Sequence, residues 1–96
     1  MRVGVLRASL RVPGARSLKE KRGPAKRLVA ELRRTFGAAA AEVDAQDLHQ
    51  RLVVGVAVVA SDGERLSERL AAIEGFLGGL PDLPLLGVAR ESFPGP

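Results

Sequence analysis

The segment from Gln50 to Ser61 constrains the fold most, because it is dense in valine and apolar at almost every position. Such β-branched residues favour strands, and a strand that is apolar on both faces belongs in the middle of a sheet. Its apolar run, Leu52 to Ala60, is far too short to span a bilayer. We therefore expect a sheet with this segment near its centre.

Three further segments are predicted strands. Residues 2–12 alternate between two faces, and residues 38–44 form a short, small-residue edge strand. A connection of hairpin length joins that edge strand to the valine-rich segment. Residues 83–90 are predicted to form the last strand, and residues 92–96 a frayed tail.

Ser17 to Phe36 is predicted to be a helix, because apolar residues recur along it at helical spacing. Ser17 and Glu20 have the spacing of a capping box at its start. Pro24 interrupts this pattern, because proline removes a backbone hydrogen bond and clashes with the preceding turn. We expect either a kink at Pro24 or a regular helix that begins only near it.

A second helix begins after Ser61 or Asp62 and ends at Gly78-Gly79. The order of elements is therefore βαββαβ. This order predicts a ferredoxin-like α+β fold, with a four-stranded antiparallel sheet and both helices on one face. Right-handed crossovers place the first and third strands in the middle. The chain length of 96 residues fits one domain, residues 1–96.

The chain contains no cysteine, which excludes disulfides, zinc–thiolate sites and cysteine nucleophiles. It has 15 Lys and Arg against 11 Asp and Glu, a formal net charge of +4. That balance permits an acidic partner such as nucleic acid without requiring one. The first twelve residues lack the apolar core of a signal peptide, so we expect a soluble, cytoplasmic protein.

Two stretches resemble signatures of the YlxP-like family, a domain-of-unknown-function group (domain of unknown function 503) of small bacterial proteins. The first runs from Pro13 through Arg16-Ser17-Leu18-Lys19-Glu20-Lys21-Arg22, and the second from Ala41 to Arg51. The resemblance implies a ferredoxin-like fold and genes that often lie near translation and ribosome-maturation genes. The family has no established activity, so the resemblance implies no catalytic residues. Many relatives have ordinary helix formers where this chain has Gly23-Pro24.

The first helix carries a row of basic residues beside its apolar stripe. Such a row can follow a phosphate backbone and release its counterions. The alternative is a solvated helix face that Glu20 and Glu31 partly neutralise. The candidate nucleic-acid or anion contacts are Arg16, Lys19, Arg22, Lys26, Arg27 and Arg33. They favour a non-enzymatic RNA- or ribosome-associated binding protein.

A metal site is one interpretation of the cluster Glu42, Asp44, Asp47 and His49, but the spacing of these residues matches no known loop pattern. A polar hairpin with a cross-strand pair between a carboxylate and Arg51 is the simpler interpretation. The chain has no asparagine, a residue on which acylphosphatases of this fold depend, and no aromatic residue in its central strands. We therefore predict no metal, cofactor or catalytic residue and no enzymatic activity, and an enzyme with a weak phosphoester or anion site at the first helix is the least favoured alternative.

The face of the sheet away from the helices is predicted to be apolar with an arginine rim. Monomers rarely leave such a patch in water, which favours an isologous homodimer. An alternative function follows from it, a dimeric protein-interaction module with no nucleic-acid role. The residues predicted for this face are Val3, Val5, Val53, Ala57 and Val59.

Overall fold

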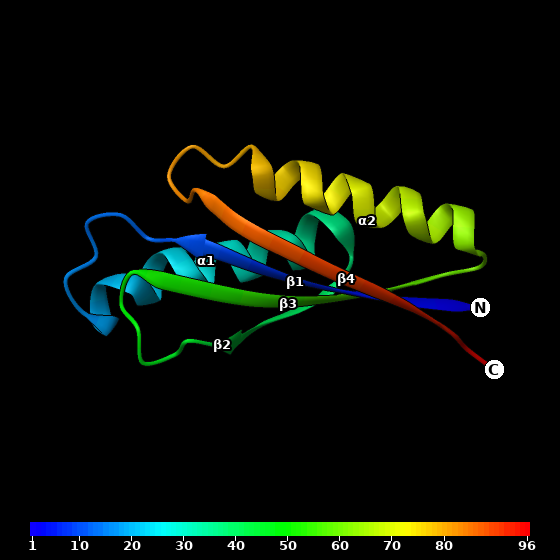
Figure 1. The fold of residues 1–96 in the computed structure, drawn as a ribbon, viewed down its shortest axis with the longest axis horizontal. Coiled ribbons are helices and arrows are strands. Elements are labelled where there is room, and N and C mark those ends of the chain that lie inside the picture. Colours follow the sequence, from blue (N-terminus) through cyan, green and yellow to red (C-terminus); the bar gives the residue numbers. More distant parts are fainter.

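The computed structural model describes residues 1–96 and contains four strands and two helices (Figure 1). In chain order they are β1 (Arg2–Arg11), α1 (Leu18–Phe36), β2 (Ala39–Asp44), β3 (Arg51–Ala60), α2 (Gly63–Gly78) and β4 (Leu85–Pro94). Neither helix is long and apolar enough to cross a membrane.

The four strands form one sheet in the order β2-β3-β1-β4, with every neighbouring pair antiparallel. The valine-rich β3 lies in the middle beside β1, and their pairing runs from Arg2 opposite Ala60 to Arg11 opposite Arg51. Both helices pack on one face, α1 over β2 and β3 and α2 mainly over β1 and β3 (Figure 1). The predicted ferredoxin-like α+β fold is confirmed.

The core lies between the sheet and the two helices. The alternation of β1 and β3 places one set of side chains towards the helices, where each is almost fully buried. The helices complete the layer from their apolar stripes. The sheet supplies Leu6, Ala8, Leu10, Leu52, Val54, Val56 and Val58, and the helices supply Ala25, Leu28, Leu32, Leu66, Leu70, Ile73 and Leu77.

Helix α1 begins at Leu18, which confirms the predicted helix from Ser17 to Phe36, and the alternative start near Pro24 is wrong. The Ser17 hydroxyl accepts a hydrogen bond from the Glu20 amide at 3.1 Å, and the Glu20 carboxylate accepts one from the Arg16 amide at 3.0 Å. The first bond satisfies an amide that the helix start leaves without a partner, and the second ties Glu20 to the residue before the cap. The capped first turn therefore forms at Leu18, and the helix continues through Pro24 to Phe36.

Asp62, and not Ser61, caps α2, because its Oδ1 accepts a hydrogen bond from the Arg65 amide at 2.8 Å. The end of the chain also differs from the prediction. β4 extends to Pro94, with Ser92 opposite Gly4 and Phe93 opposite Val3, so the frayed tail is wrong. The ten residues of β1 offer backbone partners along their whole length, and an edge strand needs no apolar alternation to use them.

Candidate functional site

The exposed side of α1 is the most basic helical surface of the chain. Its buried side carries Ala25, Leu28 and Leu32, which pack on the sheet. At about 100° per residue, Lys19 and Lys26 project almost opposite these leucines. The helix therefore separates an apolar side from a cationic one, as its sequence pattern predicts.

Five of the six predicted cations are exposed and have no partner within the chain. None of their side chains makes a hydrogen bond or an ion pair, and the two acids of α1 are occupied elsewhere. Glu20 caps the helix start, and Glu31 lies 3.8 Å from Arg34. The positive charge of this surface is thus uncompensated. We call it the basic face, and it comprises Arg16, Lys19, Arg22, Lys26 and Arg27.

Arg33, the sixth predicted residue, is held differently. Its Nε and Nη2 donate to the carbonyl oxygen of Ala40 at 3.1 and 2.7 Å. Ala40 belongs to the edge strand β2, where free backbone groups invite pairing with other chains. Arg33 therefore fastens α1 to this edge, and a contact from it to an anion stays a prediction.

Lys21 lies in the same basic run but on the opposite side of the helix, and it is only 3% exposed. Its Nζ lies 2.9 Å from Glu42 Oε2 and donates to the carbonyl oxygens of Ala45 and Arg51 at 2.9 and 3.1 Å. No other donor reaches this buried carboxylate oxygen. Lys21 was not among the predicted site residues, although its place within the apolar stripe of α1 is a signal that could have found it.

Lys21 joins the two segments that resemble family signatures. It connects the first turns of α1 to the end of β2 and the start of β3, and Gln50 adds a bond from its Nε2 to the Ala15 carbonyl at 3.2 Å. The backbone amide of Val12 donates to Gln50 at 2.9 Å. The start of α1 is therefore fixed to the sheet, which sets the spacing of the backbone positions that carry the basic face.

Two of the three acidic residues of the β2–β3 region pair with cations, and the third, Asp47, makes no ion pair. Glu42 pairs with Lys21, and Asp44 pairs with Arg7 across the sheet. His49 is exposed in the connection between the strands. No three Asp, Glu or His side chains come together in a way that could hold a metal ion. The carboxylate–arginine pair forms with Arg7, not with Arg51.

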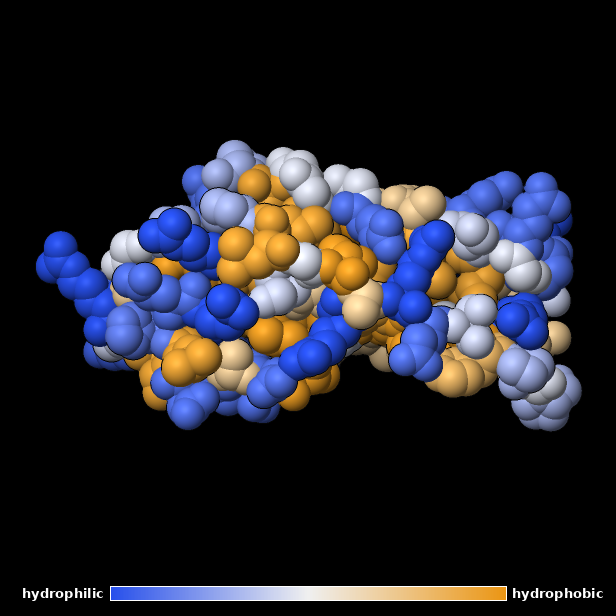
Figure 2. All heavy atoms as spheres, viewed as in Figure 1, coloured by the Kyte–Doolittle hydropathy of each residue, from blue (hydrophilic) through white to orange (hydrophobic).

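The sheet face away from the helices is apolar, and we call it the open face (Figure 2). Val5 and Val59 are exposed at 36% and 54%, and Val3 and Ala57 are half-buried. Val53 points to the same side but is only 4% exposed, so its predicted exposure is wrong. A bulge in β2 places Asp44 opposite Val53, and the β2–β3 connection lines the same depression.

Comparison with known proteins places this architecture in a family. A family model described as a protein of unknown function (DUF503) matches residues 3–90. The uncharacterized protein YlxP of Bacillus subtilis (strain 168) is 32% identical over 69 residues, which are 72% of this chain and 75% of that protein. Neither description names an activity. The family model covers both signature segments and ends within β4, at residue 90. The chain therefore belongs to the DUF503 family.

Proposed function

We propose that this protein is a non-enzymatic RNA- or ribosome-associated binding protein whose basic face contacts the phosphate backbone of RNA. One observation carries the proposal: five exposed cations at the start of α1 have no acidic partner within the chain. Cations in this state release the counterions of a phosphate chain when they bind it, which drives association. The gene neighbourhood implied by the family resemblance favours RNA of the translation machinery as the ligand.

The aromatic residues favour backbone contacts over the reading of bases. Phe36 and Phe76 pack edge to face between the two helices, with ring centroids 5.5 Å apart. The third, Phe93, lies at the end of the edge strand β4. The central strands therefore offer no ring on which a base could stack. Phosphate contacts position a protein on RNA but carry little sequence information.

The rigidity of the helix start supports the same function. Lys21 and Gln50 fasten the first turns of α1 to the sheet, so the backbone that carries the cations needs little ordering when a ligand binds. Less ordering on binding means a smaller entropic cost. The basic face is thus suited to an extended phosphate chain.

We expect the triple variant Lys19→Gln, Arg22→Gln, Lys26→Gln to bind a ribosomal RNA fragment about a hundredfold more weakly near 100 mM salt, because three phosphate contacts are lost. Fluorescence anisotropy with a labelled fragment measures the Kd. The control triple, Arg2→Gln, Arg65→Gln, Arg90→Gln, lowers the net charge of +4 by the same three units away from α1. It should weaken binding only about threefold.

Two outcomes contradict the proposal. Equal losses in both triples would mean that the total charge, and not the basic face, attracts RNA. Unchanged binding in the α1 triple would place any RNA contact elsewhere on the protein. A structured RNA unrelated to the ribosome, measured in parallel, separates ribosomal selectivity from general affinity for polyanions.

A further inference from the structure

The open face leaves an unusual amount of apolar side-chain surface uncovered. Val59, Phe93 and Val43 are exposed at 54%, 44% and 49%, and they come from three different strands. Between them lie Val5 and several alanines. Figure 2 looks onto this side of the sheet and shows the hydrophobic atoms gathered in its middle, with hydrophilic side chains around them. A continuous apolar patch of this kind marks a contact surface.

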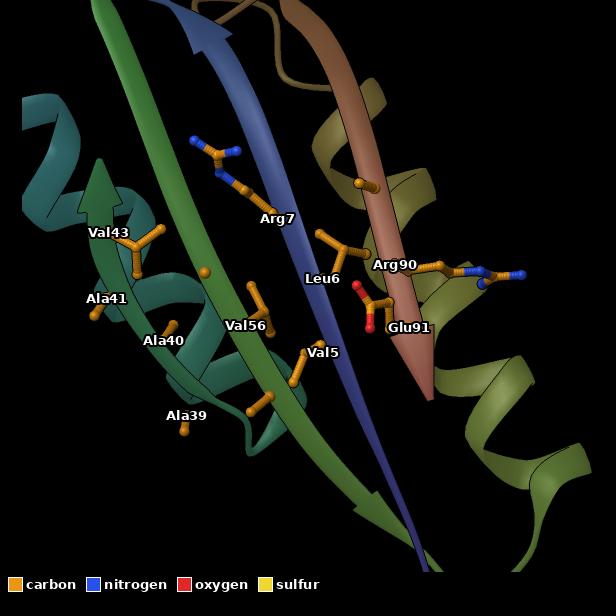
Figure 3. Close-up of a pocket in the computed structure, with 13 residues that line it drawn as sticks. Val5, Leu6, Arg7, Ala39, Ala40, Ala41, Val43, Val56, Arg90 and Glu91 are labelled. Atoms are coloured by element: carbon orange, nitrogen blue, oxygen red, sulfur yellow. The ribbon is translucent and has the colours of Figure 1, made fainter. Parts of the chain in front are cut away.

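A hollow of about 590 Å³ lies in the middle of this patch (Figure 3). Small residues at its floor create it, among them Ala41, Gly55 and Ala57. Val43 leans over Gly55, because a Cβ built there would lie 2.8 Å from its Cγ1. The hollow can therefore receive protruding apolar side chains from a partner.

We propose that a second copy of this chain covers the open face, sheet against sheet. The size of the face fits this occupant. Three strands of ten residues and one of six, about 4.8 Å apart and rising about 3.3 Å per residue, give a flat footprint of roughly 500–600 Å². Because side chains project from this plane, the accessible area is larger than the flat footprint. It approaches the roughly 800 Å² that each partner contributes to a stable interface of standard size.

The charges at the rim of the hollow also favour a second copy. Arg7 extends from β1 and Glu91 from β4, so the rim carries both signs (Figure 3). Arg7 already pairs with Asp44, whereas Glu91 has no ion pair within the chain. A two-fold axis through the hollow gives each copy the same cation and carboxylate to offer the other. A partner whose contact surface carried only one sign of charge would face repulsion from either Arg7 or Glu91.

This association leaves the basic face free, because α1 lies on the other side of the sheet. Two packed sheets are about 10 Å apart, so the two α1 helices of the dimer would lie on its outer surfaces. The inference is independent of RNA binding. Variants of the open face test the dimer, and variants of α1 test the proposed function.

Sedimentation velocity on the full chain, from about 1 to 100 µM, tests the dimer. We expect wild type to sediment at twice the chain mass of 10.1 kDa. Val59→Glu should sediment as a monomer, because it buries a charge in the apolar patch. The matched control Ala72→Glu lies on the exposed side of α2 and should remain dimeric. Circular dichroism melting shows whether each variant folds.

A second variant keeps the test decisive if Val59→Glu fails to fold. Glu91→Arg changes an exposed residue at the rim of the hollow. It should raise the dimer dissociation constant about tenfold, because the new arginine of each copy would then lie near Arg7 of the other copy. Wild-type protein that stays monomeric at about 100 µM would overturn the inference. A dimer unaffected by either variant would also overturn it, because the contact would then lie on another surface.

Discussion

Replacing Lys21 by methionine is expected to lower the free energy of unfolding by about 3–5 kcal/mol, the range observed when one partner of a buried ion pair is removed. Lys21 is only 3% exposed. Its ammonium pairs with Glu42 and donates hydrogen bonds to two backbone carbonyls. Methionine has a similar length but no donor, so the Glu42 carboxylate would lose its ion-pair partner and each carbonyl would lose one donor, although the Ala45 carbonyl keeps its bond from the Leu48 amide. Urea unfolding followed by circular dichroism measures the change.

Lys26→Met is the matched control, because Lys26 lies on the exposed side of the same helix and has no partner within the chain. Its effect should stay within about 0.5 kcal/mol. The double variant Lys21→Met, Glu42→Leu should recover a large part of the loss, because no buried charge is then left alone. A loss below about 1 kcal/mol for Lys21→Met would show that Lys21 does not hold these elements together.

Gly4→Val is expected to destabilise the fold by about 2 kcal/mol, because it overpacks the contact between β1 and α2. A Cβ at Gly4 would lie 2.9 Å from Cδ1 of both Leu66 and Leu70. Both leucines are almost fully buried, so neither side chain can move aside without disturbing the core. Urea unfolding of the variant measures the cost.

Gly55→Val makes the matched comparison on the opposite side of the sheet. In the monomer its Cβ would meet Val43, which is 49% exposed and free to turn away, so both variants are compared at a protein concentration below that of dimer formation. The gain in strand preference offsets this contact, so the change should stay below about 1 kcal/mol. Equal costs at the two glycines would contradict the assignment of one covered and one open face.

Much of the fold follows from local chemistry in the sequence. The valine-rich segment predicted a central strand, and the Ser17–Glu20 spacing predicted where α1 begins even though Pro24 argued against it. A capped first turn and the contacts of Lys21 with the sheet together hold the helix start despite the backbone bond that proline removes. The extent of β4 was missed because its final pairs depend on backbone bonds to β1, which leave little mark on side-chain patterning.

The candidate site was predictable as a charge pattern but not as a set of contacts. Periodicity distinguished the exposed side of α1 from its buried side and identified five cations that the structure leaves unpaired. It could not assign Arg33 to Ala40 or Lys21 to Glu42, because each contact joins residues that only the folded chain brings together. Val53 was misjudged for the same reason, since a bulge in β2 decides what lies beside it.

The salt dependence of RNA binding tests the central claim most directly. For a single-stranded ribosomal RNA segment, the slope of log K against log salt concentration is about −0.7 for each phosphate neutralised. Five contacts from the basic face predict a slope near −3.5, and the triple variant of Lys19, Arg22 and Lys26 should reduce it by about 2. The control triple of Arg2, Arg65 and Arg90 should leave the slope almost unchanged. The same slope for wild type and the α1 triple would contradict the assignment of the basic face as the phosphate-binding surface.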